Sequence, residues 1–229
     1  MTGASGRRRR GLLGAAVVLA LLSAACASGS APRTAGLSAS QPAVGSPPAS
    51  PTGEAPNPPP APSGLNTGPA PWPPETAHLD QRLRALGLPP LGPEVTRVHF
   101  HVNLVVFVHG RQVPVPVGIG IQLRPLKLAE IHTHSGSGTI HVEAARPRHF
   151  TLGMVFDVWG VRFTGTCLGG YCRSVPDRIR VFVDGHPFDG DPTQLDLADG
   201  QVIVVVFGAE DELPDPMPAR FVFEGPPQP

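Results

Sequence analysis

Apolar and polar residues alternate most regularly in residues 96–109. Valine, leucine or phenylalanine stands at every second position from Val98 to Val108, and the intervening positions begin with polar residues. A period of two places successive side chains on opposite faces of a β-strand, so this segment predicts a long strand. A His-Gly-Arg turn at 109–111 then predicts a hairpin whose second strand covers residues 112–121. Two prolines in that second strand favour a position at the edge of the sheet.

Shorter periodic segments predict the remaining elements. Leucines at helical spacing indicate a short helix at 76–86. Thr151 is a typical helix N-cap, and the apolar residues after it predict a helix that runs to Trp159 and ends at Gly160. Alternating or apolar runs predict the further strands, which lie at 126–131, 139–143, 178–183, 201–207 and 221–223, with a turn at 135–138.

The order of these elements predicts an α+β fold. We expect one mostly antiparallel sheet with a single helix packed on one face, in a domain at residues 75–229. Residues 181–185 and 195–204 resemble the ends of β-grasp domains, which implies a β-grasp-like sheet. A small open β-barrel is the alternative.

Composition divides the chain before this domain into two parts. Residues 26–74 are rich in proline, serine, alanine and glycine with almost no charge, so they cannot bury enough apolar surface to fold. We interpret them as a semi-extended tether. In residues 1–25, a run of arginines precedes an apolar segment and then small residues. This order is typical of an export signal peptide, and the apolar segment is too short for a membrane span.

Cys26 follows the predicted signal peptide directly. The sequence Leu-Ser-Ala-Ala-Cys at 22–26 resembles a bacterial lipobox, in which the chain is cleaved before a cysteine that becomes lipidated. The resemblance implies a lipoprotein anchored to the outer face of the bacterial cell membrane, exported by the general secretory or the twin-arginine route. An ordinary cleaved signal peptide with an incidental cysteine is the alternative.

Cys167 and Cys172 are the other two cysteines, five residues apart around a Gly-Gly pair. An exported protein works where disulfides persist, and this spacing can close a tight loop, so we expect a structural disulfide. A redox-active pair normally has a two-residue spacer at the start of a helix, which this segment lacks. Redox activity and metal ligation by the thiolates are the alternatives.

Five of the nine histidines lie in two short segments. His99 and His101 are two apart on the predicted long strand, and His132, His134 and His141 follow within ten residues of one another. Alternate residues of a strand point the same way, about 6.5–7 Å apart, so each His-x-His pair can address one metal ion. The apolar neighbours occupy the opposite strand faces. We therefore expect all five imidazoles on the open face of the sheet, away from the helix and accessible to water.

An imidazole-rich site without sulfur ligands suits Cu(II) or Zn(II). Glu130 and Glu143 border the second histidine segment, and each is a candidate for a further ligand or for a partner that orients an imidazole from behind. Chance placement of histidines on a solvated strand face is the competing explanation. The other four histidines lie at a predicted helix, turns or loops and are not expected to bind metal.

Other classes of function find little support in the sequence. A net charge of zero argues against nucleic-acid binding. The glutamate after the second His-x-His pair comes later than in the cupin metal sites that the arrangement resembles, and no Gly-x-Ser-x-Gly nucleophile motif is present. Two alternatives to a metal-binding protein remain. One is a non-catalytic interaction module for an envelope protein partner, and the other is a metalloenzyme with an open coordination position beside Glu130 or Glu143.

Several stretches resemble a family of exported bacterial proteins. They are His-Phe-His-x-Asn-Leu at 99–104, Pro-Val-Gly-Ile-Gly-Ile at 116–121, Ile-His-Thr-His-Ser-Gly-Ser-Gly-Thr-Ile-His-Val-Glu at 131–143 and Phe-Thr-Leu-Gly-Met-Val-Phe-Asp-Val-Trp-Gly at 150–160. The resemblance covers residues 97–208 and brings no established activity. It therefore implies a common structural unit and not a function.

Overall fold

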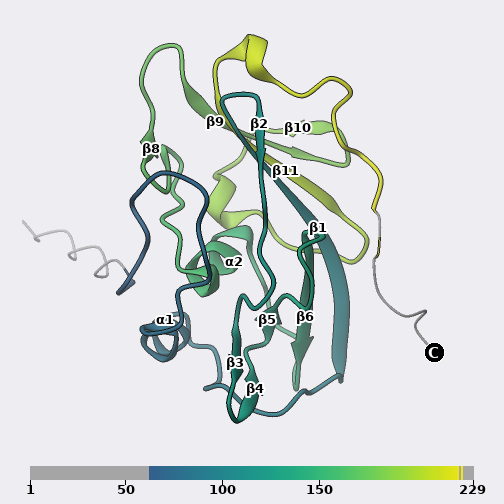
Figure 1. Ribbon diagram of the computed structural model, residues 1–229. Helices are drawn as coiled ribbons and strands as arrows, with labels where there is room; N and C mark the ends of the chain where they lie inside the picture. The colour runs from purple at the N-terminus through teal and green to yellow at the C-terminus, as the bar shows by residue number, and fades with distance from the viewer. Residues whose placement is uncertain (1–61, 222, 224–229) are drawn as a thin grey trace, which may run out of the picture. The chain divides into compact units, whose positions relative to one another are not determined.

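The computed structural model describes residues 62–221 and 223 (Figure 1). The predicted signal peptide, Cys26 and most of the predicted tether lie outside these residues. In the described part of the chain, no helix is both long and apolar enough to cross a membrane.

Strands dominate the described residues, as the alternation predicts. The strands are β1 (Val98–Val108), β2 (Arg111–Val113), β3 (Ile121–Leu123), β4 (Leu126–Leu128), β5 (Ile131–His132), β6 (Thr139–Ala144), β7 (Cys167–Leu168), β8 (Tyr171–Cys172), β9 (Arg178–Val183), β10 (His186–Phe188) and β11 (Val202–Gly208). The helices are α1 (Leu79–Ala85) and α2 (Leu152–Trp159), with short 3-10 turns η1 (Pro192–Gln194) and η2 (Glu210–Glu212).

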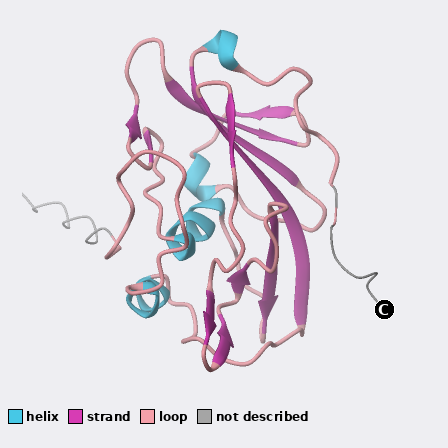
Figure 2. Ribbon diagram, in the orientation of Figure 1, coloured by secondary structure: helices cyan, strands magenta, loops and turns pink. Residues whose placement is uncertain are grey.

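One sheet organises the fold, with strand order β10-β9-β11-β1-β6-β5 and β2 paired to the end of β1. Neighbouring strands are antiparallel except for β1 and β11, which are parallel. The predicted α+β class with a mostly antiparallel sheet is therefore confirmed, and the sheet does not close into a barrel. Figure 2 shows the helices to one side of the long strands.

The core lies between α2 and the apolar face of β1. Val102, Leu104 and Val106 of β1 are at most 2% exposed and belong to the same buried cluster as Phe156 and Trp159 of α2. The helix begins and ends as predicted. The Thr151 hydroxyl accepts a hydrogen bond from the backbone N–H of Met154, and Gly160 has a φ of 83°, the left-handed conformation that favours glycine.

The folded body begins before the predicted boundary at residue 75. Trp72 is 1% exposed, and its ring lies edge-on to Trp159 with the centroids 6.0 Å apart. The Trp159 indole N–H donates to the Trp72 carbonyl oxygen at 3.0 Å. Residues 62–74 were predicted as tether because proline dominates their composition. The segment is fixed on the domain by the large apolar area of this tryptophan and by backbone hydrogen bonds of Asn66 and Gly68 with residues 160–170.

The second strand of the predicted hairpin is shorter than expected. β2 ends at Val113, because Pro114 and Pro116 have no backbone N–H to continue the ladder with β1. The chain then forms a separate two-stranded ladder, β3 with β4. The predicted strand at 221–223 is not formed at Phe221 or Phe223, and residue 222 lies outside the described residues.

The sheet face that turns away from α2 has two parts. The first, which we call the apolar end, is a buried cluster of Phe182, Val202, Val204 and Val206 against Val105 and Phe107. Side chains of the C-terminal segment, Leu213, Met217 and Phe221, pack over it. The prediction that this face is open is therefore wrong over the apolar end.

Candidate metal centre

The second part of this face, which we call the histidine end, carries His99, His101, His132, His134, His141 and Glu143. Strand register places three of the histidines in one row, because His101 on β1 and His132 on β5 both pair with His141 on β6, which lies between them. Directly paired residues point to the same face of a sheet, with their Cβ atoms about 4.5–5.5 Å apart. The three imidazoles therefore meet although they come from three strands.

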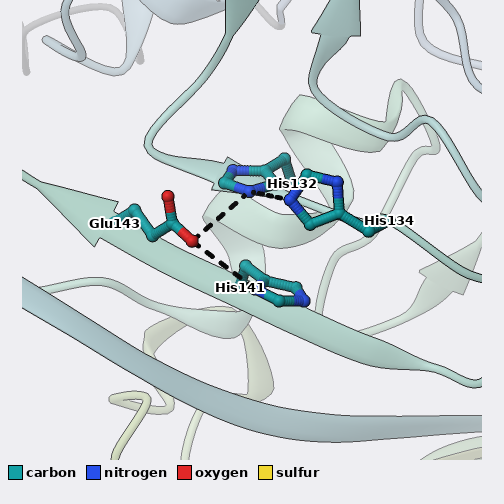
Figure 3. Close-up of side chains that lie close together, drawn as sticks. All are labelled: His132, His134, His141 and Glu143. Carbon is teal, nitrogen blue, oxygen red and sulfur yellow. Dashed lines mark hydrogen bonds and ion pairs between the residues drawn. The ribbon is translucent and has the colours of Figure 1, made fainter. Parts of the chain in front are cut away.

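A second row lies one step along the strands. His99 pairs with Glu143, and both lie on the face of the first row because each is two residues from a member of it. His134 follows β5 and turns its ring back toward His132 and His141 (Figure 3). The structure thus brings together all five histidines that the sequence singles out.

Four of these residues form a first possible metal site, which we call the Glu143 set: His132, His134, His141 and Glu143. The Nε2 atoms of His132 and His134 are 3.1 Å apart. Glu143 Oε1 lies 3.5 Å from His141 Nδ1 and 3.8 Å from His132 Nε2. A tetrahedral ion with bonds of about 2.0–2.1 Å needs donor atoms about 3.3 Å apart, so this spacing matches a coordination shell.

Three residues form a second set, which we call the His99 set: His99, His101 and His141. The Nε2 atoms of His99 and His101 are 3.0 Å apart, and His101 Nε2 is 3.2 Å from His141 Nδ1. The two sets share His141.

The histidine end is more buried than the predicted open face. His132 is fully buried, Glu143 is 4% exposed and His101 is 9% exposed, whereas His134 is exposed. The ring of Phe223 lies over His101, with the centroids 4.7 Å apart. The prediction of a wholly water-accessible site is therefore wrong, because segments without a periodic pattern fold over the strands.

Burial favours the neutral form of three of the imidazoles, those of His101, His132 and His134. It lowers the pKa of His101 to about 4, with a smaller contribution from the charges of His141 and His99. It also lowers the pKa of His132 to about 4 and the pKa of His134 in the same direction. A neutral imidazole is the form that binds metal, so protons do not compete for these nitrogens at neutral pH.

Glu143 supplies the charge of the site. Burial raises its pKa, but the hydrogen bond with His141 and the charges of His132 and His99 outweigh burial and lower the pKa overall. The residue is therefore a carboxylate at neutral pH. Its Oε2 atom is buried and has no hydrogen-bond partner among the described residues.

A carbonyl oxygen behind the site fixes the tautomer of His132. The Nδ1 atom of His132 is 2.9 Å from the carbonyl oxygen of Ala129. A carbonyl oxygen only accepts hydrogen bonds, so Nδ1 carries the proton and the Nε2 lone pair faces His134 and Glu143. This contact could not be predicted from the sequence, because any residue type supplies a carbonyl.

The two glutamates singled out in the sequence have different places. Glu143 belongs to the Glu143 set itself, whereas the Glu130 carboxylate lies outside both sets, 3.4 Å from the Arg148 guanidinium. The backbone of Glu130 still helps to position Glu143, because its carbonyl oxygen accepts the Glu143 N–H at 2.8 Å. Burial raises the pKa of Glu130.

A cavity of about 310 Å³ adjoins the Glu143 set. It is lined by the proline-rich segment 89–95 and by Leu128, Ala129, Glu130 and Ala145. His132 and Glu143 also line it. A small molecule in this cavity would therefore touch two side chains of the candidate site.

Cys167 and Cys172 lie outside both sets and form a disulfide that joins the paired strands β7 and β8. Neither sulfur is therefore a thiolate ligand, and the donors of the two sets, drawn from the described residues, are nitrogen and oxygen.

A third group of possible ligands lies elsewhere, and sequence reasoning missed it. It consists of His109, Asp177 and Glu212. His109 and Glu212 form an ion pair of 3.1 Å whose side chains are 43% and 33% exposed. An exposed ion pair needs no metal to explain it, and the three residues are too far apart in the chain to show a spacing pattern.

Comparisons of the chain with protein-family models, with curated proteins and with solved structures return no match. The functional argument therefore depends on the geometry of the histidine end.

Proposed function

We propose that this protein is an exported, lipid-anchored protein that binds Cu(II) or Zn(II) at the histidine end. The observation that carries the proposal is the Glu143 set, in which four donor atoms lie within 4.8 Å of one another. Register aligns His132 on β5 with His141 on β6, which also carries Glu143, and His134 lies just after β5, so the fold itself brings the donors together. A preformed site loses little conformational freedom on binding, which favours high affinity.

The donor types support this choice of metals. Three imidazoles and one carboxylate suit Zn(II) and Cu(II), whereas soft Cu(I) prefers thiolate and thioether ligands. The carboxylate offsets part of the charge of a divalent ion. Ca²⁺ and Mg²⁺ prefer sites built from oxygen ligands, and this site has one such residue.

The proposed location rests on the N-terminal sequence. The signal-like residues 1–25 and the lipobox-like residues that end at Cys26 support export and anchoring to the outer face of the bacterial cell membrane. The Cys167–Cys172 disulfide is consistent with an oxidising compartment.

Metal analysis of the protein purified without an affinity tag tests the function. We expect the metal-free protein to bind Cu(II) or Zn(II) stoichiometrically in a calorimetric titration, and the His134→Ala/His141→Ala variant to lose the high-affinity binding. His149→Ala is the matched control, because its side chain is 90% exposed and lies outside both sets. A protein with no measurable affinity for either ion would overturn the proposal and favour an envelope interaction module.

The cavity beside His132 and Glu143 favours a metalloenzyme as the second candidate. A substrate in this cavity would reach a bound ion directly, and an ion that keeps one open coordination position can activate water. Metal-dependent hydrolysis of a chromogenic ester by the wild type tests this candidate, because the binding function predicts none. Under the enzyme function, Glu130→Gln changes the cavity lining outside both sets, so it should keep the metal affinity and reduce the hydrolysis.

A further inference from the structure

The histidine end offers more donors than one ion can use. Zn(II) is bound by four ligands in most structural sites, and the Glu143 set already supplies four. His99 and His101 then remain, with their Nε2 atoms 3.0 Å apart and directed at each other. We propose that the histidine end holds two metal ions. The first is bound by the Glu143 set, which uses the Nδ1 atom of His141, and the second is bound by His99 and His101 with Glu143 as a ligand shared by both ions. This inference rests on the metal-binding function proposed above.

Strand spacing separates the two His-x-His pairs. The first pair lies on β1 and the second starts on β5, with β6 between them. The two strands that carry the pairs are therefore separated by two strand spacings, each of about 4.8 Å. Among the described residues, no group of donor atoms within 4.8 Å of one another contains both pairs. An ion with bonds of about 2.0–2.1 Å therefore cannot bind both pairs in this arrangement.

His99, His101 and Glu143 have the geometry of a second ion site without rearrangement. The Nε2 atoms of His99 and His101 are 3.0 Å apart and His99 Nε2 is 3.3 Å from Glu143 Oε1, close to the roughly 3.3 Å that tetrahedral coordination requires. The His99 side chain is 25% exposed, so solvent reaches this site from the side of His99. Two imidazoles and a shared carboxylate leave a position free for water or a small anion.

Glu143 connects the two sets electrostatically. Its Oε1 atom lies 3.3 Å from His99 Nε2 and 3.8 Å from His132 Nε2, so one carboxylate contacts donors of both sets. A negative charge between two cations reduces their repulsion. Its second oxygen, which has no hydrogen-bond partner among the described residues, is available to an ion. Two-metal sites in proteins have ions about 3.5–4 Å apart, a separation that one carboxylate can bridge.

The two ions are expected to differ in affinity. The first ion has three imidazoles and the carboxylate as ligands, whereas the second has two imidazoles and shares the carboxylate with the first. The second ion also binds next to the positive charge of the first. Binding should therefore be stepwise, with the Glu143 set filled first.

Stoichiometry tests the inference. The metal-free full chain is titrated with Cu(II), and the bound metal is counted after gel filtration. We expect two equivalents for the wild type and one for His99→Ala/His101→Ala, with the affinity of the tighter step retained. His132→Ala/His134→Ala should keep only the weaker equivalent. The His149→Ala variant is the control and should bind two equivalents of Cu(II). Because His132 is buried, the thermal unfolding of each variant is measured, and His134→Ala alone replaces the double variant if that variant is unfolded.

Electron paramagnetic resonance gives a second readout. Two Cu(II) ions this close couple magnetically, so the signal of the doubly loaded wild type should be broadened with a half-field transition. His99→Ala/His101→Ala should show one isolated Cu(II) signal. One equivalent in the wild type, retained without His99 and His101, would overturn the second site and leave the proposed function intact. One equivalent that needs both pairs would also overturn it. The absence of any binding would overturn both proposals.

Discussion

The apolar end and the histidine end lie on the same face of one sheet and share β1, but burial has opposite consequences in the two. At the apolar end, Val204 and Val206 are fully buried against other hydrocarbon side chains, so burial stabilises the fold directly. At the histidine end, His132 and Glu143 are as deeply buried but polar, and burial of polar groups costs free energy unless they gain partners. The partners here are the Ala129 carbonyl oxygen for His132 and the imidazoles of His99 and His141 for Glu143. Under the proposed function, a metal ion would add to them.

The largest effect that we expect from a single substitution is a loss of stability at the apolar end. Phe182→Ala should lower the free energy of unfolding by about 3–5 kcal/mol, because it leaves a cavity among Val202, Val204 and Val206. The metal affinity of the folded variant should be unchanged, since Phe182 belongs to neither donor set. Urea denaturation and a Cu(II) titration measure the two quantities. A variant that loses metal affinity while still folded would show that the two ends are not independent.

The next largest effect is expected at the histidine end, where a substitution should change metal affinity and leave stability nearly unchanged. His141→Ala should weaken metal binding at least about 100-fold, because loss even of a residue that only orients a ligand typically lowers metal affinity 10–100-fold. Both donor sets lose a member in this variant. The stability of the metal-free protein should change little, because His141 belongs to neither of the two buried apolar clusters. Calorimetry of the variant beside His149→Ala measures the affinity, and equal affinities would contradict the assignment of His141.

The difference between the ends could be predicted in part from the sequence. Alternation in β1 separates His99 and His101 from the valines of the core face, and the same parity separates His141 and Glu143 from Ile140 and Val142. This alternation identifies the sheet face that carries the histidines. It does not identify which strands are neighbours, and the site exists because His101 and His132 both pair with His141. Register depends on turns and packing across the whole sheet, so no local pattern contains it.

The covering of the sheet was the part least accessible to prediction. The C-terminal segment and residues 89–95 have no periodic pattern, yet they bury the apolar end and wall the cavity beside His132. Thr133 shows how such details arise. Its hydroxyl donates to the Pro116 carbonyl at 2.7 Å and accepts the Ile119 N–H at 3.1 Å, which fixes the backbone between His132 and His134. Nothing in the spacing of Thr133 indicates these partners.

Acid should destabilise the metal-free protein through the histidine end. His101 and His132 have pKa values of about 4 in the folded protein, below the ordinary value of about 6.5. Between these values the unfolded chain binds more protons than the folded one, so stability is lost as the pH falls from about 6.5 toward 4. Urea denaturation at several pH values measures the loss. A His101→Gln variant should lose less, and an equal loss would contradict the role of His101.

Asp157 on α2 works in the opposite direction and sharpens this test. Burial raises the pKa of Asp157 to about 6, although the charge of Arg82 opposes the increase. Between its ordinary value and about 6 the folded protein binds more protons than the unfolded chain, so this group stabilises the protein as the pH falls. Asp157→Asn should therefore make the acid loss steeper. A shallower loss would show that the pKa of Asp157 is not raised.

The smallest expected effect concerns Phe223, whose ring lies over His101 with the centroids 4.7 Å apart. Burial is the main cause of the low pKa of His101, so Phe223→Ala should raise that pKa part of the way toward its ordinary value. The shift of the His101 ring proton during an NMR pH titration measures it. Phe221→Ala is the matched control, because Phe221 packs on the apolar end and should affect stability but not this pKa. If both variants leave the pKa unchanged, the neighbouring strands and histidines alone bury His101, and the C-terminal segment covers only the apolar end.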